Sequence, residues 1–102
     1  MTAEFAVAMP AVLLVLVAAL AGVGVAALQV RAQDAAADAA RILGRGEGAG
    51  SVAAHLAVQL PGASWSSTER DGMVCVAVHV QGAGPAGAFG TLGATGCALD
   101  DR

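Results

Sequence analysis

The sequence lacks lysine and asparagine altogether, and charged residues make up only 13% of it. All five basic side chains are arginines, they form no basic cluster, and the net charge is −3. This balance argues against nucleic acid or an anionic surface as the main partner, because both require a concentrated positive face. The absence of asparagine excludes an N-glycosylation acceptor.

The residue spacings of known enzyme classes are also missing. No Ser-His-Asp, paired-carboxylate or phosphate-loop spacing is present, and the glycine-rich stretch 82–90 is not followed by a helix that opens on Lys. We interpret Ser64, Ser66 and Ser67 as polar residues of an edge strand. His55 has no second metal ligand at helical spacing, so we expect it to be a partly exposed side chain. We therefore expect no enzyme activity, no metal, no cofactor and no small-molecule substrate.

Hydrophobic residues, in contrast, make up 57% of the chain, and a long run of them lies near its start. Glu4 is followed by the 24 uncharged residues 5–28. As a helix they would reach about 36 Å, against roughly 30 Å for the hydrocarbon core of a bilayer. A secretory signal peptide fits less well, because the run is too long and no basic residue precedes it. We expect a single membrane-spanning helix in contact with lipid.

Glu4 has no nearby cationic side chain to pair with. Arg31, the nearest, would lie about 40 Å away along one straight helix. One interpretation is that Glu4 meets an amino terminus or a cation from another molecule. The other is that it is a first-turn acid favoured by the helix dipole at a wet interface. The residues alone leave both open.

Several short segments occur together in a fixed order: the run Thr2-Ala3-Glu4-Phe5, then Pro10, then the exit of the apolar helix through Leu28-Gln29-Val30-Arg31 into Asp34-Ala35-Ala36. In these segments the sequence resembles the TadE family. TadE-like proteins are minor pilins, or pseudopilins, of the tight-adherence (Tad) branch of type IV pilus systems, and this sequence is most similar to the actinobacterial form. The resemblance covers about the first 45 residues, and the rest only in general layout.

The resemblance implies an inner-membrane protein with an extracytoplasmic C-terminal domain, which enters or primes a surface filament. Its partners would be other pilin or pseudopilin subunits and the pilus assembly platform. Glu4 would neutralise a partner's N-terminal amine, while Phe5 and Pro10 would belong to the assembly surface. Family members carry a short leader that a prepilin peptidase cuts after a Gly. No Gly or basic leader precedes Glu4. Either the recorded start of the sequence lies downstream of the true one, or this protein is not processed by the peptidase.

The helix should continue well past the apolar run. Residues 29–43 contain mostly good helix formers and no Gly or Pro, so we predict one rod from about Ala3 to Leu43. Its lower half is amphipathic, with an alanine face that would let a neighbouring helix approach and a charged face with pairs at 31/34 and 38/41: Arg31, Asp34, Asp38, Arg41 and Arg45. Inside the span, small residues recur at four-residue spacing, the small-xxx-small pattern of helix packing: Ala18, Gly22 and Ala26.

Four glycines within 44–50 predict a flexible hinge between two parts of the chain. The expected organisation is a transmembrane and amphipathic helix at 1–43, the hinge at 44–50, and a small extracytoplasmic α+β domain at 51–102. Ser51 is predicted to cap a short helix, Val52 to Leu60, which Pro61-Gly62 ends.

From Ala63 onward the hydrophobic period changes to two. Strands are predicted at Ala63–Ser67, Met73–Gln81 and Thr91–Leu99, with Asp71-Gly72 as a hairpin turn and a glycine-rich loop at 82–90 that contains Pro85 and Phe89. Four alternating valines should face the core: Val74, Val76, Val78 and Val80. The predicted fold class is α+β, a long N-terminal helix followed by a short helix and a small antiparallel meander.

Cys75 and Cys97 fall in neighbouring predicted strands. They are separated by 22 residues without a CxxC, so a redox or metal pair is the poorer interpretation. Adjacent antiparallel strands can bring two cysteines within disulfide distance, and two cysteines in an extracytoplasmic domain usually pair. We predict a disulfide, with two free buried thiols as the alternative.

The whole pattern predicts a TadE-like minor pilin, a structural and assembly subunit. The alternative is a single-pass membrane accessory protein that uses its helix only as an anchor and never polymerises. The orientation of the helix in the membrane does not decide between these two functions. By the positive-inside rule Arg31, Arg41 and Arg45 favour a cytoplasmic C-terminal side, opposite to the pilin topology, although Asp34 and Asp38 lie among them.

Overall fold

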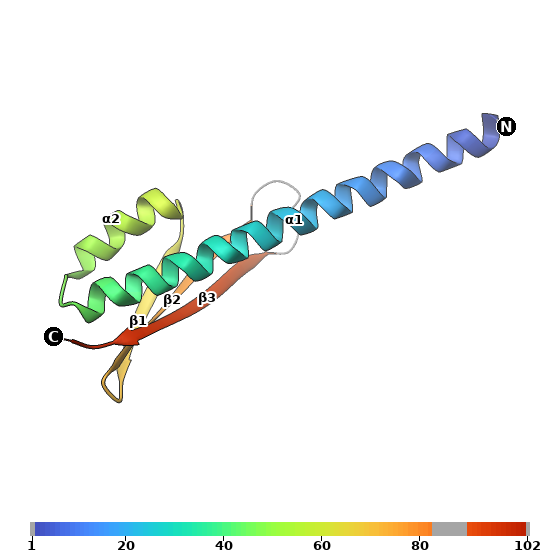
Figure 1. Cartoon of the computed structure of the whole chain (residues 1–102). Helices are drawn as coiled ribbons and strands as arrows, with labels where there is room; N and C mark the ends of the chain where they lie inside the picture. Colours follow the sequence, from blue (N-terminus) through green and yellow to red (C-terminus); the bar gives the residue numbers. More distant parts are fainter. Residues whose placement is uncertain (1, 83–89, 102) are drawn as a thin grey trace.

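A computed structural model describes residues 2–82 and 90–101 of the chain. Its elements are α1 (Thr2–Gly44), α2 (Ala49–Gln59), β1 (Ser64–Arg70), β2 (Met73–Gln81) and β3 (Thr91–Leu99). In Figure 1 the N-terminal half of α1 projects away from the other elements, which gather around its C-terminal half. The molecule is therefore elongated, with extents of 70, 24 and 15 Å. The predicted α+β layout is confirmed.

α1 is one continuous helix of 43 residues, about 65 Å long at 1.5 Å per residue. It passes through Pro10 and does not stop where the apolar run ends, because residues 29–43 are mostly alanine and other strong helix formers. The predicted rod from about Ala3 to Leu43 is confirmed.

The glycine-rich segment that follows α1 begins with a hydrogen-bonded turn. Gly46 has a φ of 88°, and its N–H donates to the Leu43 carbonyl at 3.0 Å. The Glu47 N–H donates to the Ile42 carbonyl at 3.2 Å. This pair of bonds is a Schellman motif, which satisfies the last carbonyls of the helix and needs a left-handed residue where Gly46 stands. The predicted three-part division around 44–50 stays a prediction.

α2 starts earlier than predicted. It begins at Ala49, with Gly48 as an extended N-cap, which has no side chain to accept a hydrogen bond from the first N–H groups of the helix. The prediction that Ser51 caps this helix is wrong, because the tight turn returns the chain to helical geometry before residue 51. The helix ends at Gln59, with Leu60 as its C-cap just before Pro61, close to the predicted end.

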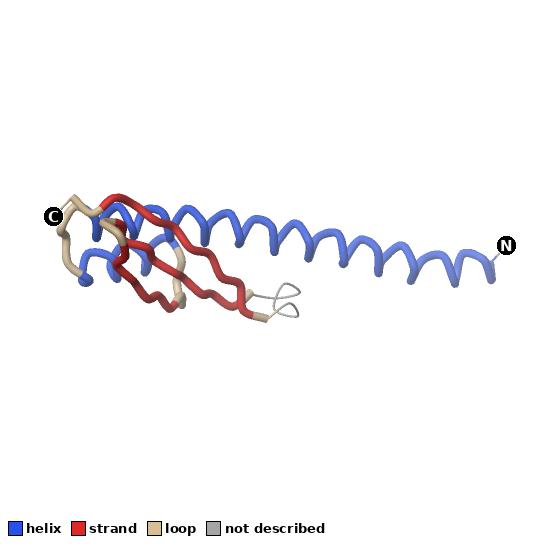
Figure 2. Tube along the Cα trace, turned by 90° about the horizontal axis from the view of Figure 1, so that it is seen from below, coloured by secondary structure: helices blue, strands red, loops and turns tan. Residues whose placement is uncertain are grey.

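The three strands form an antiparallel sheet in the order β1-β2-β3, which is the predicted meander (Figure 2). Asp71 and Gly72 have φ of 55° and 76°, the left-handed pair of a two-residue hairpin turn. β2 and β3 have the predicted bounds. β1 runs further than predicted, because pairing continues up to this turn, where Arg70 lies opposite Met73. The predicted loop residues Pro85 and Phe89 lie outside the described residues.

The core lies between one face of the sheet and the alanine face of α1. Its buried members come from α1, from α2 with its C-cap, and from β2: Ala32, Ala35, Ala36, Ala39, Ala40, Val52, Leu56, Leu60, Val74, Val76, Val78 and Val80. The four valines therefore face the core as predicted. The neighbour of the alanine face is the chain's own sheet, where the sequence suggested another helix.

The contact between α1 and β3 is close because neither side carries a bulky residue. Gly96 of β3 is buried, and a Cβ built on it would lie 2.6 Å from the backbone nitrogen of Ala37. Strand and helix backbones thus touch directly. This contact explains a glycine inside a strand that otherwise alternates regularly.

Candidate functional site

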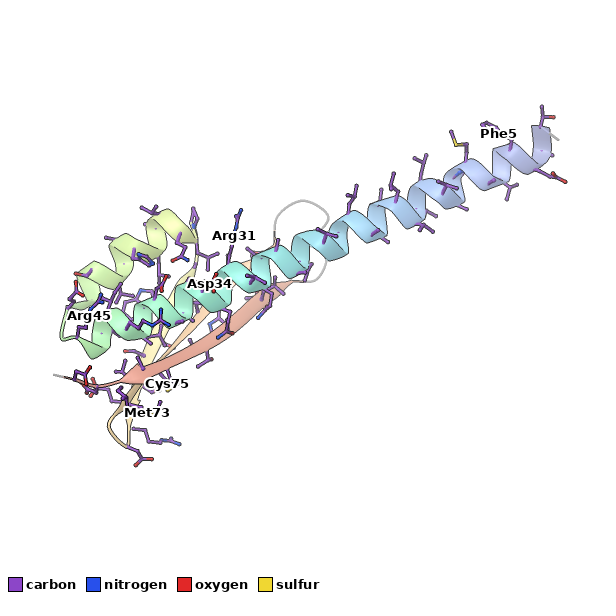
Figure 3. The ribbon with its side chains drawn as sticks, viewed as in Figure 1. Phe5, Arg31, Asp34, Arg45, Met73 and Cys75 are labelled. Atoms are coloured by element: carbon purple, nitrogen blue, oxygen red, sulfur yellow. A yellow bond between two sulfur atoms is a disulfide. The ribbon has the colours of Figure 1, made fainter. Side chains whose placement is uncertain are left out.

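The N-terminal half of α1 is an exposed apolar surface. Every residue from 2 to 20 is exposed, Leu14 to 72% and Phe5 to 65%. In Figure 3 their side chains point outward all round the helix. By length and composition this helix can cross a membrane. Each large apolar side chain gains roughly 1.5–3 kcal/mol on burial, so this surface is strongly favoured to be covered by lipid or protein.

The predicted assembly residues lie at the free end of this surface. Glu4 is in the first turn of α1, and among residues 2–82 and 90–101 no cationic side chain pairs with it. Phe5 points outward beside it (Figure 3). Pro10 lies inside the helix and has no N–H, so the carbonyl of Ala6 lacks its usual helical donor. The structure brings these residues to one end of the rod, far from the domain.

Ala18, Gly22 and Ala26 are all exposed on α1. A Cβ built on Gly22 would meet no atom of the described residues within 4 Å. Whether a second helix occupies this face stays a prediction.

The charged face of the lower half of α1 is partly paired. Arg41 Nη1 lies 3.3 Å from Asp38 Oδ1, as predicted. His55 of α2 lies on the other side of the same carboxylate, with Nε2 3.4 Å from Asp38 Oδ2, although that nitrogen is buried and forms no hydrogen bond within the described chain. His55 is partly exposed, as expected, but its neighbour comes from another helix and was missed. No group of three metal-binding side chains occurs in the described residues.

The other two arginines on this face differ from each other in their partners. Arg45 Nη2 lies 2.9 Å from Glu47 Oε2. The expected pair of Arg31 with Asp34 does not form within the part of the chain that the structure describes. Arg31 lines a recess between α1 and the end of α2.

Two glutamines of α1 hold the helix on the edge strand β3. Gln29 Nε2 donates to the Gly93 carbonyl and Gln33 Nε2 to the Thr95 carbonyl, both at 2.9 Å. Their four-residue spacing matches the two-residue spacing of outward-facing carbonyls on a strand. Sequence reasoning missed them; the only available signal was two glutamines on one helical face.

Cys75 and Cys97 lie directly opposite each other on β2 and β3 and form a disulfide with an S–S distance of 2.05 Å. Alternation along β2 puts Cys75 on the face opposite the buried valines, so the bridge lies on the outer side of the sheet. It joins the two strands without entering the core.

Comparison with protein-family models, with curated proteins and with solved structures gave no match for this chain. The site is therefore defined by its own geometry. A bare apolar rod with one acid at its tip is joined to a small domain that the same rod helps to build.

Proposed function

We propose that this protein is a membrane-anchored minor pilin or pseudopilin, similar to the TadE family, that acts as a structural and assembly subunit of a Tad-type pilus. One observation carries the proposal. The apolar half of α1 is bare, while the other half of the same helix is fixed to the sheet by buried alanines and by Gln29 and Gln33. Such a helix presents residues 2–20 on all sides to an environment outside the subunit.

Before assembly, lipid would cover the exposed part of the run at 5–28. During assembly, helices of neighbouring subunits would replace lipid. Lipid tails are as apolar as leucine, so helix association in a membrane depends on close packing and polar contacts rather than on the hydrophobic effect. Ala18, Gly22 and Ala26 would allow close packing, and Phe5 would add contact area. Glu4 would provide the polar contact by neutralising a partner's N-terminal amine.

In this proposal the protein resides in the inner membrane and then in, or at the base of, a surface filament. The small domain is extracytoplasmic and caps or decorates the structure. Its partners are other pilin subunits and the assembly platform. The disulfide on its outer face supports an oxidising compartment for the domain.

The competing function is a single-pass accessory protein that holds its domain at the membrane without polymerising. The bare helix serves that function equally well as an anchor. What separates the two is Glu4, which an anchor needs only as a favourable first-turn charge.

The test is Glu4→Gln, with Glu47→Gln as the matched control. Glu47 is an exposed glutamate paired with Arg45 beyond the end of α1, so its change removes the same charge far from the tip. Both variants should insert into membranes like the wild type. Glu4→Gln should lose pulldown of a differently tagged copy and of co-expressed pilin subunits from detergent extracts, whereas Glu47→Gln should retain it. Equal recovery with Glu4→Gln would favour the anchor.

A further inference from the structure

The part of α1 that is exposed on every side is shorter than the uncharged run at 5–28. It comprises residues 2–20, whereas Ala21 is buried and Val25 is half-buried. At 1.5 Å per residue this exposed part is about 28 Å long, which nearly equals the roughly 30 Å of the hydrocarbon core of a bilayer. The hydrocarbon core of a bilayer that surrounds residues 2–20 therefore ends close to Ala21.

One end of the domain lies just beyond this level. Gln29 donates to the Gly93 carbonyl, and the second glutamine bond, four residues on in α1 and two residues on in β3, shows that the strand runs in the same direction as the helix. Gln29 lies about 12 Å beyond Ala21 along the helix axis. The pair Gln81–Thr91 at the end of the sheet comes two residues before Gly93, about 6.6 Å back along β3, and so lies about 5 Å beyond Ala21. The headgroup layer adds about 5–8 Å on each side of the hydrocarbon, so this end stands at headgroup depth.

We call this the basal end of the domain. Its exposed residues are Pro61, Gly62, Gln81 and Thr91. Pro61 and Gln81 both line the recess beside residues 24–28 of α1, which places the end of α2 at the same level as the end of the sheet. The basal end thus offers an amide, a hydroxyl and small uncharged groups beside the helix.

Charged side chains of the domain are confined to its other end. Segments 48–68 and 72–99, which include nearly all of α2 and of the sheet, contain no Asp, Glu, Lys or Arg. Charged residues make up about 25% of an ordinary soluble domain, so this composition indicates a surface that meets something other than bulk water. The charged residues after position 48 in the described chain lie at the β1–β2 turn and just after β3, about 26 Å from Gln81 along β2 (Figure 1): Glu69, Arg70, Asp71, Asp100 and Asp101.

α1 shows the same arrangement of charge. It carries no charged residue between Glu4 and Arg31, and Arg31 lies about 15 Å beyond Ala21, above the headgroup layer. The helix therefore passes from hydrocarbon through headgroups into water before its first charge on the domain side.

We propose that the basal end is a docking surface for the lipid headgroups of the bilayer that α1 crosses. The two surfaces are continuous, because α1 leaves the hydrocarbon core where the basal end begins, so the lipids around the helix are the first molecules that this end meets. The Gln81 amide and the Thr91 hydroxyl donate to phosphate and ester oxygens of these lipids, and no charged group has to lose water there. The acid-rich end is held away from anionic lipids, which would repel it. The domain is thus seated on the membrane without a spacer, an inference that rests on the membrane-anchoring part of the proposed function.

The test measures the depth of single tryptophans in the full chain, reconstituted in phosphatidylcholine vesicles at a protein-to-lipid ratio that keeps copies apart. Every variant carries Trp65→Phe, because Trp65 is the one native tryptophan. Gln81→Trp and Thr91→Trp report the basal end. Ser51→Trp, in the first turn of α2, is the matched control at the far end, and Leu14→Trp reports the exposed part of α1. One quencher is a nitroxide on the lipid headgroup, and the other is bromine on the acyl chains.

Headgroup nitroxide should remove most of the emission of Gln81→Trp and Thr91→Trp and little of that of Ser51→Trp, while chain bromine should quench Leu14→Trp. Circular dichroism checks the fold of each variant, and the two basal variants keep the test decisive where one of them does not fold. If Leu14→Trp is quenched but neither basal variant responds to the nitroxide, the docking surface is refuted and the membrane anchor stands. Equal quenching of Ser51→Trp and the basal variants would mean that the domain lies on its side along the bilayer, which also refutes the basal contact. If Leu14→Trp keeps its emission in brominated lipid, the membrane anchor fails and this inference fails with it.

Discussion

Replacing Gly96 by alanine should push β3 away from α1 and destabilise the domain. The added Cβ would lie 2.6 Å from the nitrogen of Ala37 and 2.7 Å from the carbonyl carbon of Ala36, both backbone atoms of α1. A helix backbone cannot rotate away as a side chain can. Restoring ordinary contact at about 3.5 Å requires β3 and α1 to move apart by about 1 Å.

Two costs add up. Overpacking of a tight core typically costs about 1–3 kcal/mol. Moving β3 also lengthens the bonds from Gln29 and Gln33 to its carbonyls, each worth about 0.5–1.5 kcal/mol. We expect Gly96→Ala to lower the free energy of unfolding by about 2–4 kcal/mol, which in a domain of this size lowers the melting midpoint by about 8–32 °C.

The assay is thermal unfolding of the full chain in detergent micelles, followed by fluorescence of Trp65. This is the single tryptophan of the sequence, and it packs against the core. Gly50→Ala is the matched control, since a Cβ on that helical glycine meets no described atom within 4 Å and alanine is the better helix former. It should melt at or above the wild-type midpoint. If Gly96→Ala melts within about 2 °C of wild type, a range equivalent to less than about 0.5 kcal/mol, the direct backbone contact between α1 and β3 is refuted.

Two further predictions concern the bridge and the topology. The air-oxidised, folded chain should offer no thiol to alkylation, and two reactive thiols in that chain would exclude the bridge. Reduction of Cys75–Cys97 should lower the free energy of unfolding by about 3 kcal/mol, because the bridge closes a loop across a sequence separation of 22 residues. A reporter that fluoresces only in the cytoplasm, fused after Arg102, should stay dark; bright cells would place the domain on the cytoplasmic side, as the positive-inside rule favours.

The sequence predicted the elements whose signal is local. The alternation of Val74 to Val80 determined one strand and its buried face, and Asp71-Gly72 determined the hairpin. The uncharged run and the helix formers after it determined α1. Each of these depends on residues within one or two turns of one another, which is the range that sequence patterns report.

What the sequence did not predict depends on contacts between distant segments. Gly96 is one of two glycines in β3, and no local pattern shows that it is the point where β3 touches Ala37. Gln33 was predicted only as part of a helix, yet its side chain donates a hydrogen bond to the Thr95 carbonyl, 62 positions away in the sequence. The recess at Arg31 needs the ends of α2 and β2 to meet α1. None of these partners can be chosen from the sequence without knowing which faces meet.

Because α1 is continuous, it couples the position of the domain mechanically to the orientation of the apolar end. The same helix that lies bare at one end is embedded in the domain at the other, and no joint interrupts it between Thr2 and Gly44 within the described chain. A tilt of 10° at the apolar end would swing the far end of a rod of about 65 Å through about 11 Å. The domain must follow, because its core is built on that rod. Any change in the tilt of the apolar half is thereby converted into a displacement of the outer face of the domain. The disulfide between Cys75 and Cys97 links β2 to β3 on that face, so the two strands move together.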